Sequence, residues 1–235
     1  MRTLIASLGG PPVSWPAASG SATPVGMRDT SPESESQANW RDLLRAIRSR
    51  QTELMRQRPW RDSGLVPNPS GREQQLADAE SRLGRALPPS YRAFLASHDG
   101  WPRFYEGAGL LGSKDLGREK HLDLVTQTFE SCFPPSDEAP TAANSHKPHL
   151  LPFGIDAAGT TLFAFDLDSQ REDGEYEVVA WLNEVGVRRA DFTSFLRLVL
   201  ELCDSEYAEL KREHGSSADS EESDSSELLA VAAIA

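Results

Sequence analysis

Apolar residues recur at helical spacing in three stretches of the chain. In residues 39–58 they fall on one face, and arginines occupy the other face. A second periodic stretch covers residues 73–87, and a third covers residues 191–213 with a broad apolar face. These spacings predict three helices, and Asn39 is the expected N-cap of the first.

A proline elbow follows the second predicted helix. Pro88-Pro89 breaks that helix, and Pro89 suits the first turn of a new one, where a missing N–H costs little. The apolar stripe of this short helix consists of Tyr91, Phe94 and Leu95. Asp99-Gly100 then supplies a left-handed exit. We predict two short helices that cross over a common core, with Tyr91 and Phe94 pointing into it beneath a sheet.

Strand patterns begin only in the second half of the chain. Apolar or alternating runs separated by tight turns occupy residues 150–155, 160–167 and 176–182. They predict three strands of an antiparallel meander. Residues 101–149 show no single period, and the runs at 110–111 and 121–129 fit a short strand or a helix equally well.

The two ends of the chain lack apolar periodicity. Residues 1–38 are rich in Gly, Pro, Ser and Ala, and residues 214–235 are rich in Ser, Asp and Glu. We predict a disordered leader and a disordered acidic tail. Residues 39–71 then form a basic helix with a Pro/Gly linker, and residues 72–213 form the folded domain. Met27 is an alternative start of the chain.

Charge is unevenly distributed over the 235 residues, whose net charge is −12. The basic stretch 40–61 carries +5, whereas residues 204–235 carry −7. An acidic body opposes general binding to phosphate backbones, so we expect no nucleic-acid partner and favour a basic protein partner. The basic helix has three interpretations: it binds RNA, it packs on the domain through Trp40, Leu44 and Ile47, or it contacts the acidic tail.

The cysteines and the lengths of the apolar runs bear on the cellular compartment of the chain. The two cysteines, Cys132 and Cys203, fit reduced thiols in a cytoplasmic chain better than a disulfide. No apolar run approaches the roughly 20 residues that a membrane helix needs, so we expect no membrane partner. We expect a monomer.

Motifs for catalysis or metal binding are weak. His146 and His149 form the closest histidine pair, but Pro148 stands between them and no further ligand completes a site. The sequence contains no Gly-x-Ser-x-Gly nucleophile elbow and no glycine-rich phosphate loop. We therefore expect no catalytic, cofactor-binding or metal site.

Two groups of residues are candidates for contacting a protein partner. Trp101 and Tyr105 follow the Asp-Gly stop, and they are either core residues or aromatic anchors of an interface. Acidic residues gather at the expected sheet turns, where they form either a solvated edge or a negative surface that steers a basic partner. The acidic candidates are Asp156, Asp166, Asp168, Glu172 and Asp173.

Three short motifs resemble the SMI/KNR-type domain of the SUKH superfamily over about residues 72–204. The first runs from Leu76 through Glu80 and Leu83-Gly84 to the elbow helix, and its core positions are Leu87, Pro88, Tyr91, Phe94, Leu95 and Gly100. The second is Leu151-Pro152-Phe153-Gly154 followed by Gly159 and by Phe163-x-Phe165-Asp166. The third is the closing helix with Phe192, Phe195 and Leu196. One departure is Asp99-Gly100-Trp101, where the family often has Asn-Gly and a small residue.

The resemblance implies an α+β fold, in which helices pack on one face of a mostly antiparallel sheet. It also implies a protein-binding role without enzymatic activity. Bacterial members resemble immunity proteins that neutralise toxins, and fungal members resemble regulators of cell-wall synthesis and signalling. We expect an immunity protein that binds its toxin stoichiometrically, and the alternative is a regulatory or scaffold module.

Overall fold

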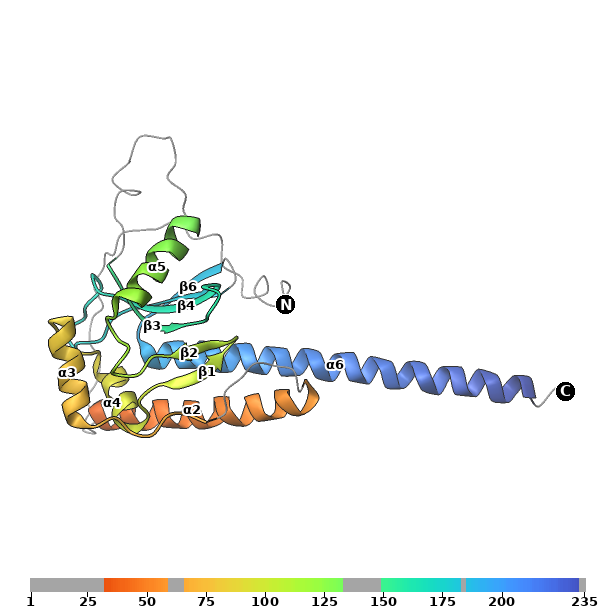
Figure 1. Ribbon diagram of the computed structural model, residues 1–235. Coiled ribbons are helices and arrows are strands. Elements are labelled where there is room, and N and C mark those ends of the chain that lie inside the picture. Colours follow the sequence, from red (N-terminus) through yellow and green to blue (C-terminus); the bar gives the residue numbers. More distant parts are fainter. Residues whose placement is uncertain (1–31, 59–65, 133–148, 183–184, 233–235) are drawn as a thin grey trace, which may run out of the picture.

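The computed structural model describes residues 32–58, 66–132, 149–182 and 185–232. Its six-stranded sheet is antiparallel throughout, with the strands in chain order. The strands are β1 (Trp101–Tyr105), β2 (Ala108–Leu110), β3 (Leu150–Ile155), β4 (Thr161–Asp166), β5 (Val178–Leu182) and β6 (Val185–Arg189). The helices are α2 (Pro32–Gln57), α3 (Glu73–Leu83), α4 (Pro89–Ser97), α5 (Glu119–Cys132) and α6 (Phe192–Ala232) (Figure 1).

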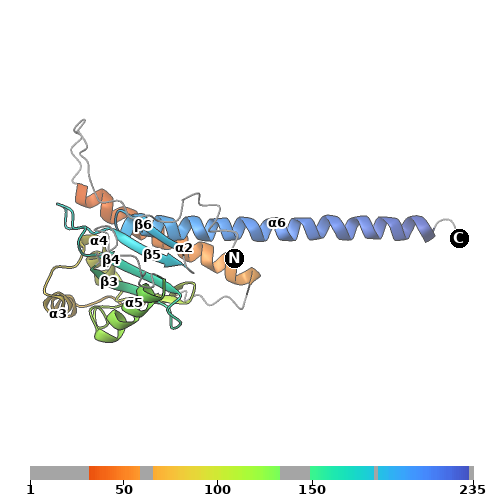
Figure 2. The same ribbon diagram turned by 90° about the horizontal axis from the view of Figure 1, so that it is seen from above.

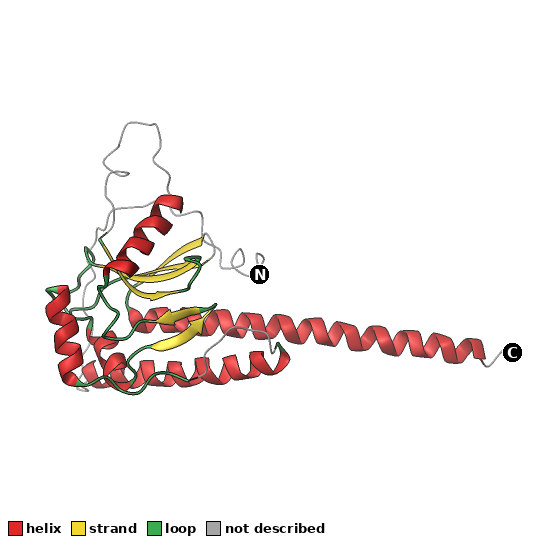
Figure 3. Cartoon of the chain, in the orientation of Figure 1, coloured by secondary structure: helices red, strands yellow, loops and turns green. Residues whose placement is uncertain are grey.

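The sheet separates two layers of helices (Figures 1 and 3). Successive strand residues point to opposite faces, so Phe163 and Phe165 of β4 join the main core with α2, α4 and α6. Leu162 of the same strand joins a smaller cluster with Val125 of α5 on the other face. The α+β class with an antiparallel sheet is confirmed, but the expectation that helices pack on one face is corrected, because α5 covers the opposite face.

The three predicted strands are present as β3, β4 and β5, but the sheet continues at both ends. Residues 101–110 form the hairpin β1–β2, and residues 185–189 form β6. The edge strands of the sheet are β1 and β6. Both are short, and β1 contains the exposed Pro102 and Arg103. Edge strands that carry proline and charge lose the alternating signature by which a strand is recognised in a sequence.

The proline elbow has the predicted architecture. Tyr91, Phe94 and Leu95 are fully buried, and the Tyr91 ring contacts Phe153 and Phe192 at centroid distances of 5.2 and 5.0 Å. The Tyr91 hydroxyl donates to the carbonyl oxygen of Leu111 at 2.6 Å, which gives this buried hydroxyl its hydrogen-bond partner. The short helix α4 is therefore fixed to the sheet by both apolar and polar contacts, as the motif predicts.

The Asp-Gly stop is a corner that holds β1 against the segment after β2. Asp99 accepts hydrogen bonds from the backbone N–H of Ser113, at 2.5 Å, and from its hydroxyl, at 3.0 Å. Gly100 has φ of 92°, and a Cβ there would lie 2.8 Å from both the Gly112 nitrogen and the Leu110 oxygen. Only glycine fits this backbone conformation and this close approach.

Helix α2 begins earlier than the sequence pattern indicates. It starts at Pro32 rather than after the expected cap Asn39, and proline is well suited to a first helical position. The rest of the predicted leader and the linker residues 59–65 lie outside the described residues. The interpretation that α2 folds onto the domain is confirmed, because Trp40, Leu44 and Ile47 are buried in the main core.

Helix α2 is connected to its neighbours by polar contacts as well. Arg50 Nε donates to Asp204 Oδ1 of α6 at 2.6 Å, and Arg58 approaches Glu206 and Glu213 of α6. The buried Gln51 donates its side-chain N–H to the carbonyl oxygen of Phe104, which lies on the edge strand β1. Helix α2 thus pairs with α6 and also covers one edge of the sheet.

Helix α6 is longer than the predicted helix of residues 191–213, since it continues to Ala232 where we predict a disordered tail. Figures 1 and 2 show the additional turns running beyond the body of the protein, with no other labelled element beside them. Most helical stability in proteins comes from tertiary packing, and no labelled element of the described structure lies beside this portion to supply it.

We therefore expect backbone amides of residues 214–232 to exchange with deuterium far faster than those of residues 195–210 on the same helix. Hydrogen–deuterium exchange followed by mass spectrometry measures both segments in one sample. Equal protection of the two segments would show that the long helix is stable by itself.

Candidate protein-binding surface

The connection between β4 and β5, residues 167–177, presents an acidic surface. Asp168, Glu172 and Asp173 are all exposed there. Arg171 lies between them, and it forms ion pairs with Asp173 at 2.7 Å and with Asp191 at 3.4 Å. The three acidic candidates of this loop thus share one surface and keep contact with solvent. We refer to residues 167–177 as the acidic loop.

Hydrogen bonds within the acidic loop fix its backbone. Gly174 donates to the oxygen of Arg171 at 3.0 Å, and the Arg171 nitrogen donates to the oxygen of Glu175 at 2.9 Å. At the loop's end, the Glu177 nitrogen donates to the hydroxyl of Ser169 at 2.8 Å. The backbone that carries these carboxylates is consequently ordered before any partner arrives, which lowers the entropy lost on binding.

Glu175 attaches the acidic loop to the first turn of α4. Its two carboxylate oxygens accept from the backbone N–H of Ser90 at 2.7 Å and from the Ser90 hydroxyl at 2.9 Å. Burial raises the pKa of Glu175 above its ordinary value of 4.5, although the two bonds from Ser90 act in the opposite direction. The raised pKa means that the folded protein holds this proton more tightly than the unfolded chain does.

This pKa shift gives Glu175 a defined effect on stability. Well below pH 4.5 the carboxyl is protonated in both states. Between pH 4.5 and the raised pKa the unfolded chain ionises while the folded protein keeps its proton, so the contribution of Glu175 to stability is lost through this window and stays constant above it. We expect the free energy of unfolding of the wild type to fall, relative to that of Glu175→Gln, across this pH window. Denaturant titrations of both proteins from pH 4 to 7 test this expectation, which two parallel pH profiles would contradict.

Asp156 is not part of the acidic surface, which corrects its assignment as a partner-binding residue. It is 9% exposed and belongs to the β3–β4 turn. Its carboxylate accepts from the Thr160 hydroxyl at 2.7 Å and from the Thr161 nitrogen at 3.1 Å. Asp156 precedes β4 and the acidic loop follows it, so the two lie at opposite ends of that strand.

Asp166 is the second correction, because it is 7% exposed. One carboxylate oxygen accepts from Arg188 of β6 at 2.7 Å, and the other accepts from the Asp168 nitrogen at 3.2 Å. Asp166 therefore links β4 to β6 and shapes the start of the acidic loop. The sequence suggested instead that Asp166 contacts a partner directly, but its carboxylate is buried and paired with Arg188.

The aromatic candidates are also buried. Trp101 is 2% exposed, and its ring contacts Phe104 and His98 at centroid distances of 5.4 and 6.4 Å. Tyr105 is buried at the other end of β1. Their interpretation as anchors of an interface is therefore wrong, and the alternative of core packing is correct. The hairpin β1–β2 adds two strands to the predicted sheet, and it places both side chains in the main core.

A groove of about 450 Å³ lies between β2, the start of α5 and the β3–β4 turn. Leu110 and Leu111 supply apolar wall, while Lys120 and His121 of α5 supply polar groups. Burial, followed by the nearby charge of Lys120, lowers the pKa of His121. Sequence reasoning missed this groove, because residues 101–124 carry no periodic signal that would bring them together.

Metal binding and membrane crossing each require specific features of the described part of the chain. Within it, no group of three or more His, Cys, Asp or Glu side chains has the geometry to hold a metal ion. None of its helices combines the length and the apolar character that crossing a membrane requires. Cys203 is a buried thiol in α6.

Comparison with known families agrees with the fold and the motifs. The model of the SMI1 / KNR4 family (SUKH-1) matches residues 71–198, from two residues before α3 to the first turns of α6. No curated protein matches the chain. Helix α2 and most of α6 therefore lie outside the matched region.

Proposed function

Because the chain belongs to the SMI1/KNR4 (SUKH-1) family, we propose that it is a non-enzymatic protein-binding domain that neutralises a basic toxin by stoichiometric binding. The proposal places it in the cytoplasm as a monomer. The main support for the proposal is the acidic loop: its carboxylates are exposed, and its backbone is fixed by internal hydrogen bonds.

Charge and rigidity both support this role. Opposite charges on two proteins accelerate their encounter, and an acidic patch discriminates against acidic partners. The loop is also anchored to α4 through Glu175 and Ser90, so binding has less loop motion to arrest. Asp168, Glu172 and Asp173 are the residues that we assign to partner contact.

We expect the variant with Asp168, Glu172 and Asp173 all changed to lysine to associate more slowly with its toxin and to lose most of the salt dependence of association. Salt screens such interactions over about 8 Å at physiological ionic strength. Stopped-flow association rates at low and high salt measure the effect. The protein to test as the toxin is any basic toxin domain that a neighbouring gene encodes.

A matched control changes three exposed acidic residues elsewhere, Asp78, Asp123 and Glu201, to lysine, which alters net charge equally. The proposal predicts a much smaller effect for this control. Equal effects of the two variants would show that overall charge, not the acidic loop, governs association. A wild-type protein that does not bind the neighbouring toxin would contradict the immunity role.

A regulatory or scaffold module is the second candidate function. Helices α2 and α6 favour this function, because both extend beyond the family match and pack against each other. A minimal inhibitor needs no such addition. The two functions differ in their cellular effect: deletion of the gene sensitises cells to the neighbouring toxin only if the protein provides immunity.

A further inference from the structure

The indole N–H of Trp40 has no acceptor among the described residues. Trp40 is 1% exposed, and its Nε1 is buried without a hydrogen-bond partner. A buried donor without a partner is costly, so such groups in folded proteins call for an explanation. Trp40 lines a pocket of about 200 Å³ between α2 and the end of α4.

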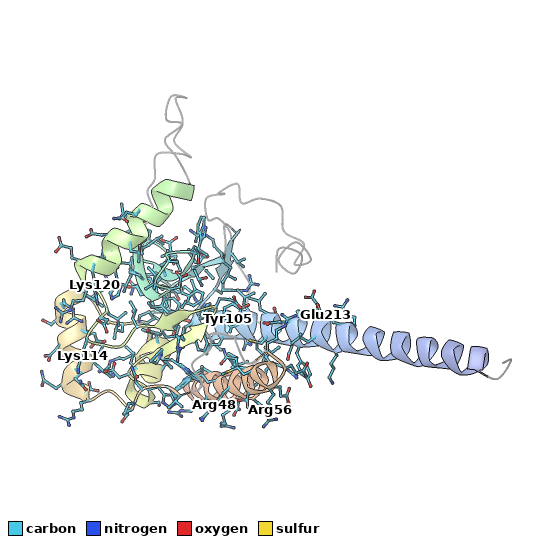
Figure 4. All side chains as sticks on the ribbon, turned by 45° about the vertical axis from the view of Figure 1, so that its right-hand side comes forward. Arg48, Arg56, Tyr105, Lys114, Lys120 and Glu213 are labelled. Atoms are coloured by element: carbon cyan, nitrogen blue, oxygen red, sulfur yellow. The ribbon has the colours of Figure 1, made fainter. Side chains whose placement is uncertain are left out.

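Three arginines of α2 surround this pocket. Arg41, Arg45 and Arg48 all line it and are all exposed, and they follow one another at helical spacing on the same face. Among the described residues, Arg45 forms its ion pair with Asp42, in an exposed contact at 2.8 Å that contributes little. Figure 4 shows Arg48 pointing away from the body of the protein.

The remaining walls of the pocket are mostly apolar, with Ser97 and His98 as the polar members. Leu44, Pro67 and Trp101 contribute to it, next to His98. The site therefore combines a small apolar cavity, a buried N–H donor and three positive charges at the rim. This combination is complementary to a peptide that carries an apolar side chain between carboxylates.

We propose that this pocket, which we name the arginine pocket, binds an acidic linear segment of a second protein partner. One apolar side chain enters the cavity, and the shift of pocket side chains that admits it gives an oxygen of the segment access to Trp40 Nε1, which is shielded from solvent in the free protein. Flanking carboxylates contact Arg41, Arg45 and Arg48, in the charge-assisted manner that is typical of arginine.

A peptide fits these features better than a single-stranded nucleic acid. Nucleic-acid sites stack bases on accessible aromatic faces, whereas Trp40 and Trp101 are both buried. The net charge of −12 also opposes a long polyanion, while a short acidic segment contacts only the three arginines.

The arginine pocket is separate from the acidic loop. The loop contacts the start of α4 at Ser90, whereas the pocket includes Ser97 at the end of that helix. The pocket also depends on α2, which lies outside the family match of residues 71–198. The inference thus concerns a second partner, and it stands whether or not the protein neutralises a toxin.

Fluorescence anisotropy with a labelled synthetic peptide, in which a single leucine is flanked on both sides by Asp and Glu, tests the proposal. We expect the full chain to bind it, and the triple variant Arg41→Glu, Arg45→Glu, Arg48→Glu to show no saturable binding. The control Lys114→Glu, Arg118→Glu, Arg212→Glu changes three exposed cations elsewhere and should retain the affinity. Equal losses in both variants would overturn the proposal.

Trp40→Phe tests the hydrogen bond separately from the charge, because it removes the N–H donor, together with part of the ring system, and leaves the three arginines in place. Hydrogen bonds to charged groups are strong enough that we expect binding on the order of tenfold weaker. Replacing the leucine of the peptide by serine should also weaken binding if the cavity receives that side chain. Unchanged affinity in both experiments, or tighter binding of a single-stranded RNA through the same arginines, would overturn the proposal.

Discussion

Replacing Phe94 by alanine should destabilise the protein by about 3–5 kcal/mol, the range found for buried phenylalanines. Phe94 is 0% exposed and lies at the centre of an aromatic cluster. Its ring contacts Tyr91, Phe192 and Trp40 at centroid distances of 5.5, 5.5 and 6.3 Å. The cavity left by the ring would therefore affect α2, α4 and α6 at once, and chemical denaturation monitored by circular dichroism measures the loss.

Leu122→Ala is the control for this experiment, because Leu122 is one of the exposed large apolar residues. It should change the free energy of unfolding by less than about 0.5 kcal/mol, as surface substitutions usually do. A loss below 1 kcal/mol for Phe94→Ala would mean that α4 does not pack in solution as it does in the structure.

Ile47→Asp should cost more than about 4 kcal/mol, since it removes a buried apolar side chain and places a carboxylate in the core. Ile47 is 0% exposed and belongs to the main core together with residues of α6. The expected result is a protein that is largely unfolded at ambient temperature. The midpoint of thermal unfolding and the yield of soluble protein both report this change.

The matched control is Ser49→Asp, which introduces the same residue two positions away on the exposed side of α2. It should leave the unfolding midpoint nearly unchanged. If Ile47→Asp were equally harmless, α2 would be an appendage that detaches from the domain. The arginine pocket, which α2 helps to form, would then not persist in solution.

The sequence by itself determined the elements whose periodic pattern is dictated by burial on one side. Tyr91 and Phe94 stand at helical spacing after a proline pair, and this pattern identified both their helix and its inward face. The run of residues 160–167 identified the strand β4. Proline and glycine acted locally in the same way, because Gly100 adopts a left-handed φ of 92° that glycine accepts without strain.

Tertiary structure alone decided which acidic and aromatic residues reach the surface. Asp156, Asp166 and Asp168 have the same side chain in similar turns, yet only Asp168 is exposed. The difference for Asp166 depends on Arg188, a residue of β6 that is 22 positions away in the chain. Charge pairing across strands is a long-range contact, and no local pattern encodes it.

The arginine pocket depends on packing in the same way. Trp40 and Leu44 come from α2, while His98 and Trp101 come from a corner more than 50 residues later. The sequence showed that α2 has an apolar face and an arginine face. Only the packing of that apolar face in the main core places the arginines beside a cavity, because the location of a cavity depends on where two surfaces fail to fill the space between them.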